Sequence, residues 1–258
     1  MKLSEFLAIA CCALLNMSCS VKEDRDVCPC RLVLDMVDVD TSVVKYAELV
    51  VGTSEGFYFR DTLVVEDFAR EYVVDVPRGD VGVGVYCGAG GCVDDTGGIG
   101  IEYGEECPAV YMYSSVFEAR GEQVVEEVSM KKNHCIMTIQ VEAKKEFPFR
   151  LEAKGCVDGY ELGGIPSVGD FMYAMYVDGE GECRLTLPRQ RDNSLMLEVS
   201  DGTDVLKCFA LGEYVAASGY DWEADELNDI VVTLDYALTR LKIAVEGWRE
   251  EYVFNIVI

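Results

Sequence analysis

Short runs of β-branched and aromatic residues, separated by turn-forming residues, repeat along the chain from residue 32 to its end. Within these runs, apolar and polar side chains alternate with the period of two that marks a strand buried on one face. The runs cover residues 32–39, 57–65, 71–76, 81–87, 124–129, 135–142, 149–153, 171–177, 195–199, 230–236, 239–245 and 252–258. Because each strand must bury its apolar face against a second sheet, the pattern predicts an all-β fold of antiparallel β-sandwiches. Only two short segments, Glu66–Glu71 and Leu211–Ala217, are helix candidates.

The length of the chain, 258 residues, suits one large or two ordinary domains. A polar, proline-ended segment from Val141 to Pro148 follows a strong predicted strand, which is typical of a domain boundary. We therefore expect an N-terminal sandwich over residues 31–145 and a C-terminal sandwich over residues 146–258.

The N-terminus has the pattern of a cleaved lipoprotein signal peptide. Lys2 precedes an apolar run from Phe6 to Leu15, and Ser18 stands before Cys19. The run is about ten residues long, whereas a membrane span needs roughly 20. We predict a signal peptide over residues 1–18, an acylated (palmitate-bearing) Cys19 and a lipidated tether over residues 19–30. A plain secretory signal, or a buried first element with a chance cysteine, is the alternative.

The next residues resemble an export signal. Lys22, Glu23 and Asp24 are similar to the Lys-acidic-acidic tracts that send lipoproteins of Bacteroidota to the outer face of the outer membrane. The resemblance implies a surface-exposed protein that is held to the outer membrane by its N-terminal lipid.

The composition is strongly acidic, with 47 Asp and Glu against 22 Lys and Arg and a net charge of −25. Loss of residues 1–18 removes Lys2 and Glu5 together, so the net charge does not change. Nucleic acid is bound through clustered Lys and Arg, which are absent here, so we predict no nucleic-acid partner. The acidity favours solubility and repulsion from anionic surfaces.

The cysteine pattern favours disulfides and buried thiols over a metal site. Zinc pairs usually come with matched partners and usable histidines, and His134 is the sole histidine, so we predict no metal. An exported chain meets an oxidising compartment. Cys87 and Cys92 flank a flexible glycine loop and are the predicted disulfide, whereas Cys28 and Cys30 are too close in sequence to pair well.

The residues around the possible catalytic motifs do not suit a catalytic role. Gly52–Gly56 matches G-x-S-x-G, but a strand-like Phe57-Tyr58-Phe59 follows where a nucleophile elbow needs a helix, so a hairpin loop is predicted. His134 opens a strand and is expected to face solvent, without an identifiable nucleophile. The acidic clusters lack the D-x-D-x-D-G calcium loop and are expected to be solvated loop tips. We predict a protein that is not an enzyme and has no cofactor.

Several segments together resemble the FimB-type fimbrial anchor lipoproteins of Bacteroidota. They are Asp24–Leu32, Leu187–Leu195, Gly219–Trp222, Leu227–Ile230, Leu234–Ala237 and Val245–Trp248, and the resemblance covers essentially the whole mature chain. It implies two transthyretin-like β-sandwich domains and a role at the base of a fimbrium (pilus). There the protein would hold fimbrillin-like stalk subunits to the outer membrane and limit polymerisation. The richness in cysteine departs from the family pattern.

The last run of the chain is a candidate for strand pairing with a stalk subunit. Tyr252, Phe254, Ile256 and Ile258 would share one face of a strand, and a strand from another chain can satisfy an open sheet edge. An ordinary last strand of the chain's own sandwich is equally compatible with the pattern.

Other functions share many of these features. A surface glycan- or protein-binding lipoprotein would need exposed aromatic residues, for which Tyr103, Tyr111 and Tyr113 are the clustered candidates. An accessory or tip subunit of a fimbrium is a further alternative. An exported hydrolase would need a convergent set of titratable groups, and the sequence nominates none.

Overall fold

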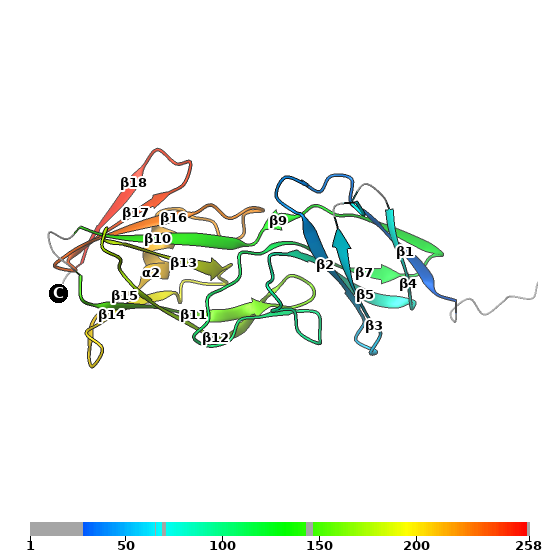
Figure 1. Cartoon of the computed structure of the whole chain (residues 1–258), viewed down its shortest axis with the longest axis horizontal. Helices are drawn as coiled ribbons and strands as arrows, with labels where there is room; N and C mark the ends of the chain where they lie inside the picture. Colours follow the sequence, from blue (N-terminus) through cyan, green and yellow to red (C-terminus); the bar gives the residue numbers. More distant parts are fainter. Residues whose placement is uncertain (1–27, 65, 69–70, 143–146, 257–258) are drawn as a thin grey trace, which may run out of the picture.

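The computed structural model describes residues 28–64, 66–68, 71–142 and 147–256 (Figure 1). The predictions on the signal peptide, Cys19, the tract Lys22–Asp24 and Ile258 lie outside the described residues. The predicted all-β sandwich fold is confirmed, with the strands gathered into two sandwiches that follow each other along the chain.

The N-terminal sandwich packs a three-stranded sheet on a five-stranded sheet. The first sheet has the order β4-β1-β8, and β1 pairs antiparallel with β4 but parallel with β8. The second has the order β3-β2-β5-β7-β9 and is antiparallel throughout. The strands are β1 (Cys30–Asp35), β2 (Tyr46–Gly52), β3 (Tyr58–Val64), β4 (Glu71–Val76), β5 (Gly79–Cys87), β7 (Tyr111–Ala119), β8 (Gln123–Glu127) and β9 (Lys131–Lys132). Alternate residues such as Leu32, Leu49 and Val83 are fully buried between the sheets, as the period of two requires.

The C-terminal sandwich is larger and carries the helix. One sheet has the order β13-β10-β16-β17-β18, and the other has β12-β11-β14-β15, with β6 added beside β11. The elements are β6 (Ile99–Gly100), β10 (His134–Glu142), β11 (Arg150–Tyr160), β12 (Pro166–Tyr176), β13 (Glu182–Pro188), β14 (Met196–Ser200), β15 (Val205–Phe209), α2 (Leu211–Ala217), β16 (Ile230–Asp235), β17 (Arg240–Val245) and β18 (Glu251–Asn255). Helix α2 has the predicted bounds. In the other helix candidate, residues 66–68 form a turn and β4 begins at Glu71.

The chain passes from one sandwich to the other earlier than the expected boundary at residue 145. Strand β10 lies between β13 and β16 of the C-terminal sandwich, so the change occurs between β9 and β10, at residue 133. The local pattern does not reveal this, because β10 alternates equally well wherever its apolar face is covered. Its partners are strands that follow it by about 50 and 100 residues, with Met137 opposite both Leu185 and Ile230.

The predicted strands are present, and the structure explains why two of the unpredicted ones, β2 and β7, have a weak local signal. Strands β2, β6, β7, β9, β13 and β15 were not predicted. In β2, Leu49, Val50 and Val51 are all fully buried, because the second sandwich covers the outer face at Val50. In β7, Ser114 faces the second sandwich and donates to a backbone carbonyl there. A strand covered on both faces loses the alternation by which strands are recognised.

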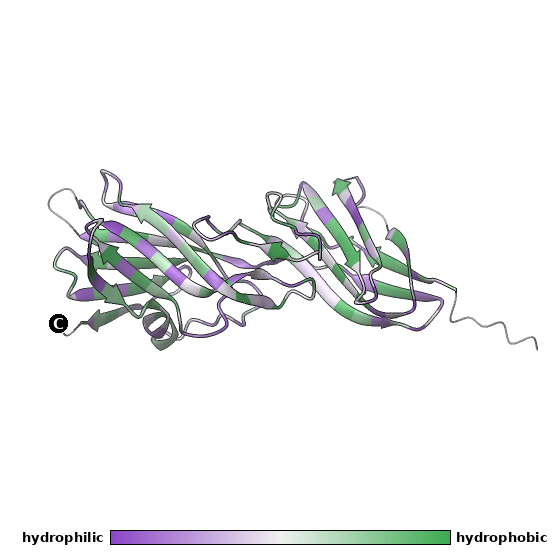
Figure 2. Ribbon diagram, turned by 90° about the horizontal axis from the view of Figure 1, so that it is seen from below, coloured by the Kyte–Doolittle hydropathy of each residue, from purple (hydrophilic) through white to green (hydrophobic). Residues whose placement is uncertain are grey.

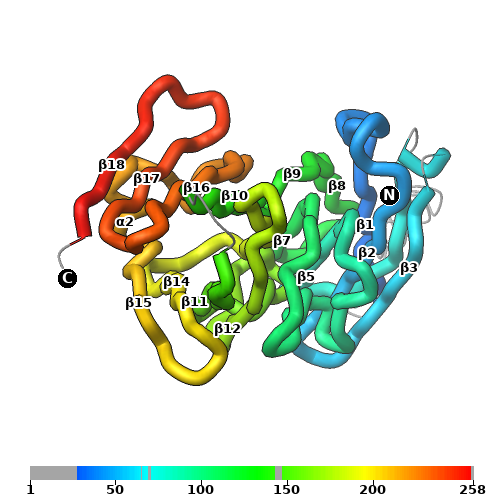
Figure 3. The backbone as a smooth tube through the Cα atoms, turned by 60° about the vertical axis from the view of Figure 1, so that its left-hand side comes forward, coloured from blue at the N-terminus to red at the C-terminus, as the bar shows by residue number. Residues whose placement is uncertain are grey.

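The molecule is elongated, with the two sandwiches end to end along its long axis (Figure 1). Strand β1 lies in one lobe and β18 in the far part of the other, while β9 lies between the lobes (Figures 1 and 3). Apolar residues concentrate on the strands and hydrophilic residues on many of the connecting loops (Figure 2).

Candidate functional site

Strand β18 forms an open edge of the C-terminal sandwich. Among the described residues it pairs with β17 alone, with Phe254 opposite Leu241 and Tyr252 opposite Ile243. The amide of Ile256 donates to the carbonyl of Thr239 at 2.7 Å. Because alternate residues of an antiparallel strand direct their backbone groups to opposite sides, Tyr252, Phe254 and Ile256 bond to β17.

The other backbone groups of β18 face outward. By the same alternation, Glu251, Val253 and Asn255 turn their N–H and C=O groups to the open edge. No backbone group in the described part of the chain bonds to them there. An edge of this kind is a template for pairing with another strand.

The side chains of β18 confirm the alternation but assign its apolar face to the chain's own core. Phe254 and Ile256 pack against the core of the C-terminal sandwich, and the Phe254 ring lies 4.9 Å from the ring of Tyr214 on α2. Val253, on the other face, is 53% exposed. In this structure β18 is therefore the last strand of its own sandwich, and pairing of its outer edge with another chain stays a prediction.

The opposite edges of this sandwich each form a hydrogen bond with the segment between β6 and β7. Edge strand β12 accepts a hydrogen bond at the Met172 carbonyl from the amide of Gly104, at 3.0 Å. Edge strand β13 donates from the Thr186 amide to Glu106 Oε1 at 2.6 Å. The segment that supplies Gly104 and Glu106 lies between β6 and β7, so one segment contacts both edges. On the other side of the sandwich, β18 and β15 are the edge strands.

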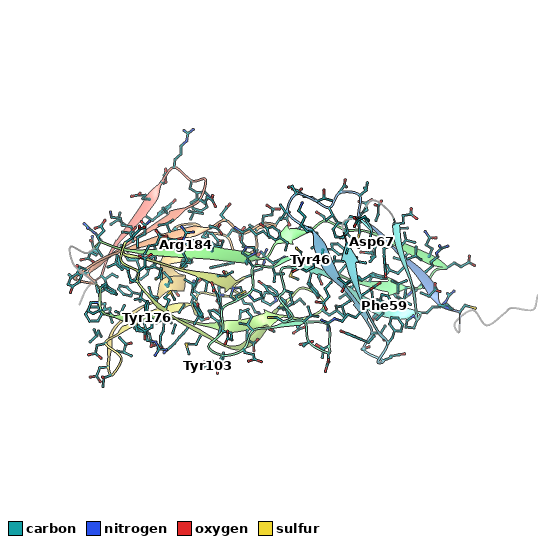
Figure 4. All side chains as sticks on the ribbon, viewed as in Figure 1. Tyr46, Phe59, Asp67, Tyr103, Tyr176 and Arg184 are labelled. Carbon is teal, nitrogen blue, oxygen red and sulfur yellow. The ribbon has the colours of Figure 1, made fainter. Side chains whose placement is uncertain are left out.

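Of the three tyrosines proposed for a glycan platform, Tyr103 alone is exposed, and Tyr111 and Tyr113 are half-buried. Tyr103 is 65% exposed and lies at the periphery of the molecule (Figure 4). Tyr111 packs edge-on against the ring of His134, with centroids 5.4 Å apart. Tyr113 packs against the core of the N-terminal sandwich and donates to Glu126 at 2.5 Å.

His134 is buried, contrary to the expectation of a solvent-facing residue. It opens β10 as predicted, but its side chain is only 2% exposed and its Nδ1 lies 3.0 Å from the carbonyl oxygen of Val110. Burial lowers the pKa of His134, which keeps the ring neutral at pH 7. The position between the two sandwiches, rather than the place in the strand, explains the burial. By contrast, Gly52–Gly56 does form the predicted hairpin loop between β2 and β3.

All nine described cysteines are free thiols in the structure, Cys87 and Cys92 among them. Cys87 packs against the core of the N-terminal sandwich, whereas Cys92 packs against the cluster at the domain joint. Burial raises the pKa of both thiols, which makes them less reactive at neutral pH. The disulfide between them stays a prediction.

Three of the six segments that carry the family resemblance, Leu187–Leu195, Gly219–Trp222 and Leu227–Ile230, contribute to the joint between the sandwiches. Arg189 donates from Nε to Asn133 Oδ1 at 3.0 Å, and from Nη1 to the carbonyls of Trp222 and Ala224. Asp229 pairs with Lys132 at 2.6 Å and accepts from the amide of Ile136 at 2.8 Å. These residues therefore fix the connection between β9 and β10. Sequence reasoning noticed the tracts, but not that they form one structural unit.

A cavity of about 960 Å³ lies beside the joint, between the segment 91–106 and the strands β11 and β12. Two of its carboxylates are engaged locally: Asp94 accepts from Thr96 and Gly98, and Asp158 accepts from Ser167 at 2.7 Å. Within the described ranges, no group of three His, Cys, Asp or Glu side chains is arranged to hold a metal ion. The described residues also contain no helix of the length and apolarity needed to span a membrane.

Solved structures share this fold. No protein-family model matches the chain, and no curated protein matches its sequence. A structure from Bacteroides thetaiotaomicron, described as candidate polysaccharide-binding proteins (DUF1812), has a TM-score of 0.60 at 14% identity and covers 88% of this chain and 98% of its own. The fimbrial anchor protein Mfa2 from Porphyromonas gingivalis has a TM-score of 0.55 at 12% identity, covering 89% and 100%. A candidate adhesin from Bacteroides ovatus has a TM-score of 0.56 at 13% identity, covering 88% and 95%. At these identities the likeness concerns the fold.

Proposed function

We propose that this protein is a surface-exposed outer-membrane lipoprotein that anchors a fimbrium to the cell and ends its polymerisation. It pairs the open edge of β18 with a strand of a fimbrillin-like stalk subunit. The observation that carries the proposal is the placement of this edge in the far part of the C-terminal lobe, while β1, the strand that would follow the proposed tether in sequence, lies in the other lobe (Figure 1). The likeness in fold to a fimbrial anchor protein supports it.

The edge also defines the chemistry of the partner strand. A strand added beside β18 would place alternate side chains next to Phe254 and Ile256, where apolar residues extend the core. Its other side chains would lie next to Glu251 and Val253 on the outer face, where a basic residue would complement the exposed Glu251. The partner strand is thus expected to alternate apolar residues with polar or basic ones.

Proline at Val253 tests the edge without breaking the sandwich. The Val253 amide faces outward, so Val253→Pro removes a donor that β17 does not use and places the ring where a partner would pair. We expect the variant to lose co-purification of the stalk subunit while its melting temperature stays close to that of the wild type. Val253→Thr, which keeps the amide and a β-branched side chain, is the matched control and should bind normally.

Retention of the stalk subunit by Val253→Pro would show that β18 is not the contact. If Val253→Pro lowers the melting temperature as well as abolishing binding, a second variant is needed. Val253→Lys, which keeps the backbone N–H, then distinguishes loss of strand pairing at the edge from unfolding of the sandwich. Deletion of the gene should release fimbriae into the medium or alter their length. Normal, firmly attached fimbriae in the deletion strain would contradict the anchoring role.

The membrane attachment has its own test. Cys19→Ala should release the protein from the membrane fraction or leave it unprocessed. Alanine at Lys22, Glu23 and Asp24 should keep acylation but abolish protease accessibility on intact cells. An unmodified mature N-terminus in mass spectra of the membrane fraction would contradict the lipid anchor.

A further inference from the structure

We propose that the hairpin between β11 and β12 is a clasp that locks the two sandwiches into one rigid rod. A pulling force between the two ends of the molecule would then be transmitted across the joint by the clasp as well as by the chain at residue 133. The rigidity of the joint does not depend on the proposed function, whereas the presence of a pulling force does. The hairpin comprises residues 161–165 and belongs to the C-terminal sandwich.

A pair of glycines in the N-terminal sandwich receives the tip of the hairpin. Gly52 of β2 lies directly opposite Gly82 of β5. A Cβ atom added at either position would lie 3.1 or 3.0 Å from Cδ2 of Leu162. The missing side chains thus leave a track on the outer face of the sheet, and the Leu162 side chain occupies it. The sequence signal was a run of alternate glycines in a strand, which marks a close approach of another part of the chain.

The backbone of the hairpin also contacts the N-terminal sandwich. Ser114 of β7 donates its hydroxyl to the carbonyl of Leu162. Gly164 has a φ of +76°, and a Cβ there would lie 2.9 Å from the Cβ of Ser114 and 3.3 Å from Cε of Met112. A Cβ added at Gly163 would lie 3.2 Å from Val116. The hairpin therefore fits closely because its tip carries glycine at both positions.

An apolar cluster runs without interruption from one sandwich to the other. It joins Val50, Tyr86 and Met112 of the first to Tyr160 of the second, through Val93 and Ile99 of the connecting segment, and all are at most 6% exposed. Separate movement of the sandwiches would expose this apolar surface to water, which is unfavourable. Domain interfaces that are large and apolar hold domains fixed.

Hydrogen bonds also fix the segment in which the chain passes from one sandwich to the other. The Tyr160 hydroxyl donates to the carbonyl of Asn133 and accepts from the amide of Arg189 at 2.7 Å. Strand β6, which comes from the segment between β5 and β7, pairs with the end of β11. Three connections thus span the joint: the hairpin tip, the β6 segment and the chain itself. A single flexible linker would have none of the cross-bonds.

The test measures rigidity in the full mature chain carrying Cys19→Ala, without any partner. Leu162→Asp places a charge on the apolar glycine track and should open the joint. Ile165→Asp is the matched control, since it adds the same charge to the same hairpin at a side chain that is 55% exposed. Small-angle X-ray scattering reports the distribution of shapes, and calorimetry reports whether the sandwiches unfold together.

We expect the wild type and Ile165→Asp to scatter as a single elongated conformation and to unfold in one transition. Leu162→Asp should require an ensemble of bent shapes and should unfold in two transitions. Wild-type scattering that already requires such an ensemble would overturn the clasp, and so would a Leu162→Asp variant indistinguishable from the control.

If Leu162→Asp does not fold, a pair of substitutions that enlarges residue 82 and shortens residue 162 tests the same contact. Gly82→Ala crowds Leu162 and should loosen the joint, while Leu162→Ala added to it relieves the contact and should restore the single conformation. Absence of this rescue, with Gly82→Ala behaving as the wild type, would overturn the clasp. Because no stalk subunit is present, failure of the clasp is distinguishable from failure of the anchoring function.

Discussion

Arg189 holds the joint through its guanidinium group, and its removal should destabilise the protein more than the loss of any surface arginine. Arg189→Ala removes the bond to Asn133 Oδ1 at 3.0 Å, the bond to the Ala224 carbonyl at 2.7 Å and the bond to the Trp222 carbonyl. It also leaves these acceptors without a donor in a partly buried region. Charged hydrogen bonds of this kind contribute roughly 1.5–3 kcal/mol each when buried.

We take the lower end of that range, because the Arg189 side chain is only half-buried. Three such bonds, at about 1.5 kcal/mol each, then predict a loss of about 4.5 kcal/mol in the free energy of unfolding, a large share of the typical stability of a domain. Arg189→Lys should recover only a small part, because an ammonium cannot reproduce the planar fork of donors.

Urea denaturation followed by tryptophan fluorescence measures this loss, since Trp222 is buried and its carbonyl is one of the acceptors. The matched control is Arg184→Ala, five residues earlier. Arg184 pairs with Glu182 at 3.0 Å and its side chain is 69% exposed, so its removal should cost less than about 0.5 kcal/mol. If Arg189→Ala destabilises the protein no more than this control, the joint does not depend on the guanidinium and the reasoning is refuted.

Three further predictions follow from buried or constrained groups. The pKa of His134 is lowered in the fold, so its contribution to stability is present above the unfolded pKa of about 6.5 and is lost as the pH falls through the folded pKa. His134→Phe should therefore flatten the dependence of the unfolding free energy on pH between 7.5 and 5.5, and a dependence as steep as that of the wild type would contradict this. Peptide mapping without reduction should find Cys87 joined to Cys92 in protein exported to an oxidising compartment, whereas alkylation of both as free thiols would show that the ring does not form. Gly159→Ala should destabilise the protein by about 2 kcal/mol or more in thermal unfolding, because φ at Gly159 is +150° and the new Cβ would meet the carbonyl oxygen of Ile99. The control Gly179→Ala, where a new Cβ has nothing within 4 Å, should change stability by less than about 0.5 kcal/mol, and equal effects of the two substitutions would refute the reasoning.

The sequence alone determined the elements whose signal is local. Alternation with a period of two predicted strands such as β4 and β10 closely, and α2 was predicted with its observed bounds. The glycine-rich loop Gly52–Gly56 was recognised as a hairpin loop because strand-like residues, Phe57-Tyr58-Phe59, follow it where a nucleophile elbow needs a helix. These features depend on neighbours within a few residues, so no knowledge of the fold was needed for them.

Only the tertiary structure decided which strands share a sheet and which side chains meet. Alternation reports that one face of a strand is covered, but not by what, so β10 could be placed in either sandwich until its pairing with β13 and β16 was known. The same limit concealed the burial of His134, which arises at the joint and not in the strand that begins there. It also concealed the meeting of Arg189 with Trp222, because contacts between residues far apart in sequence depend on the packing of the whole chain.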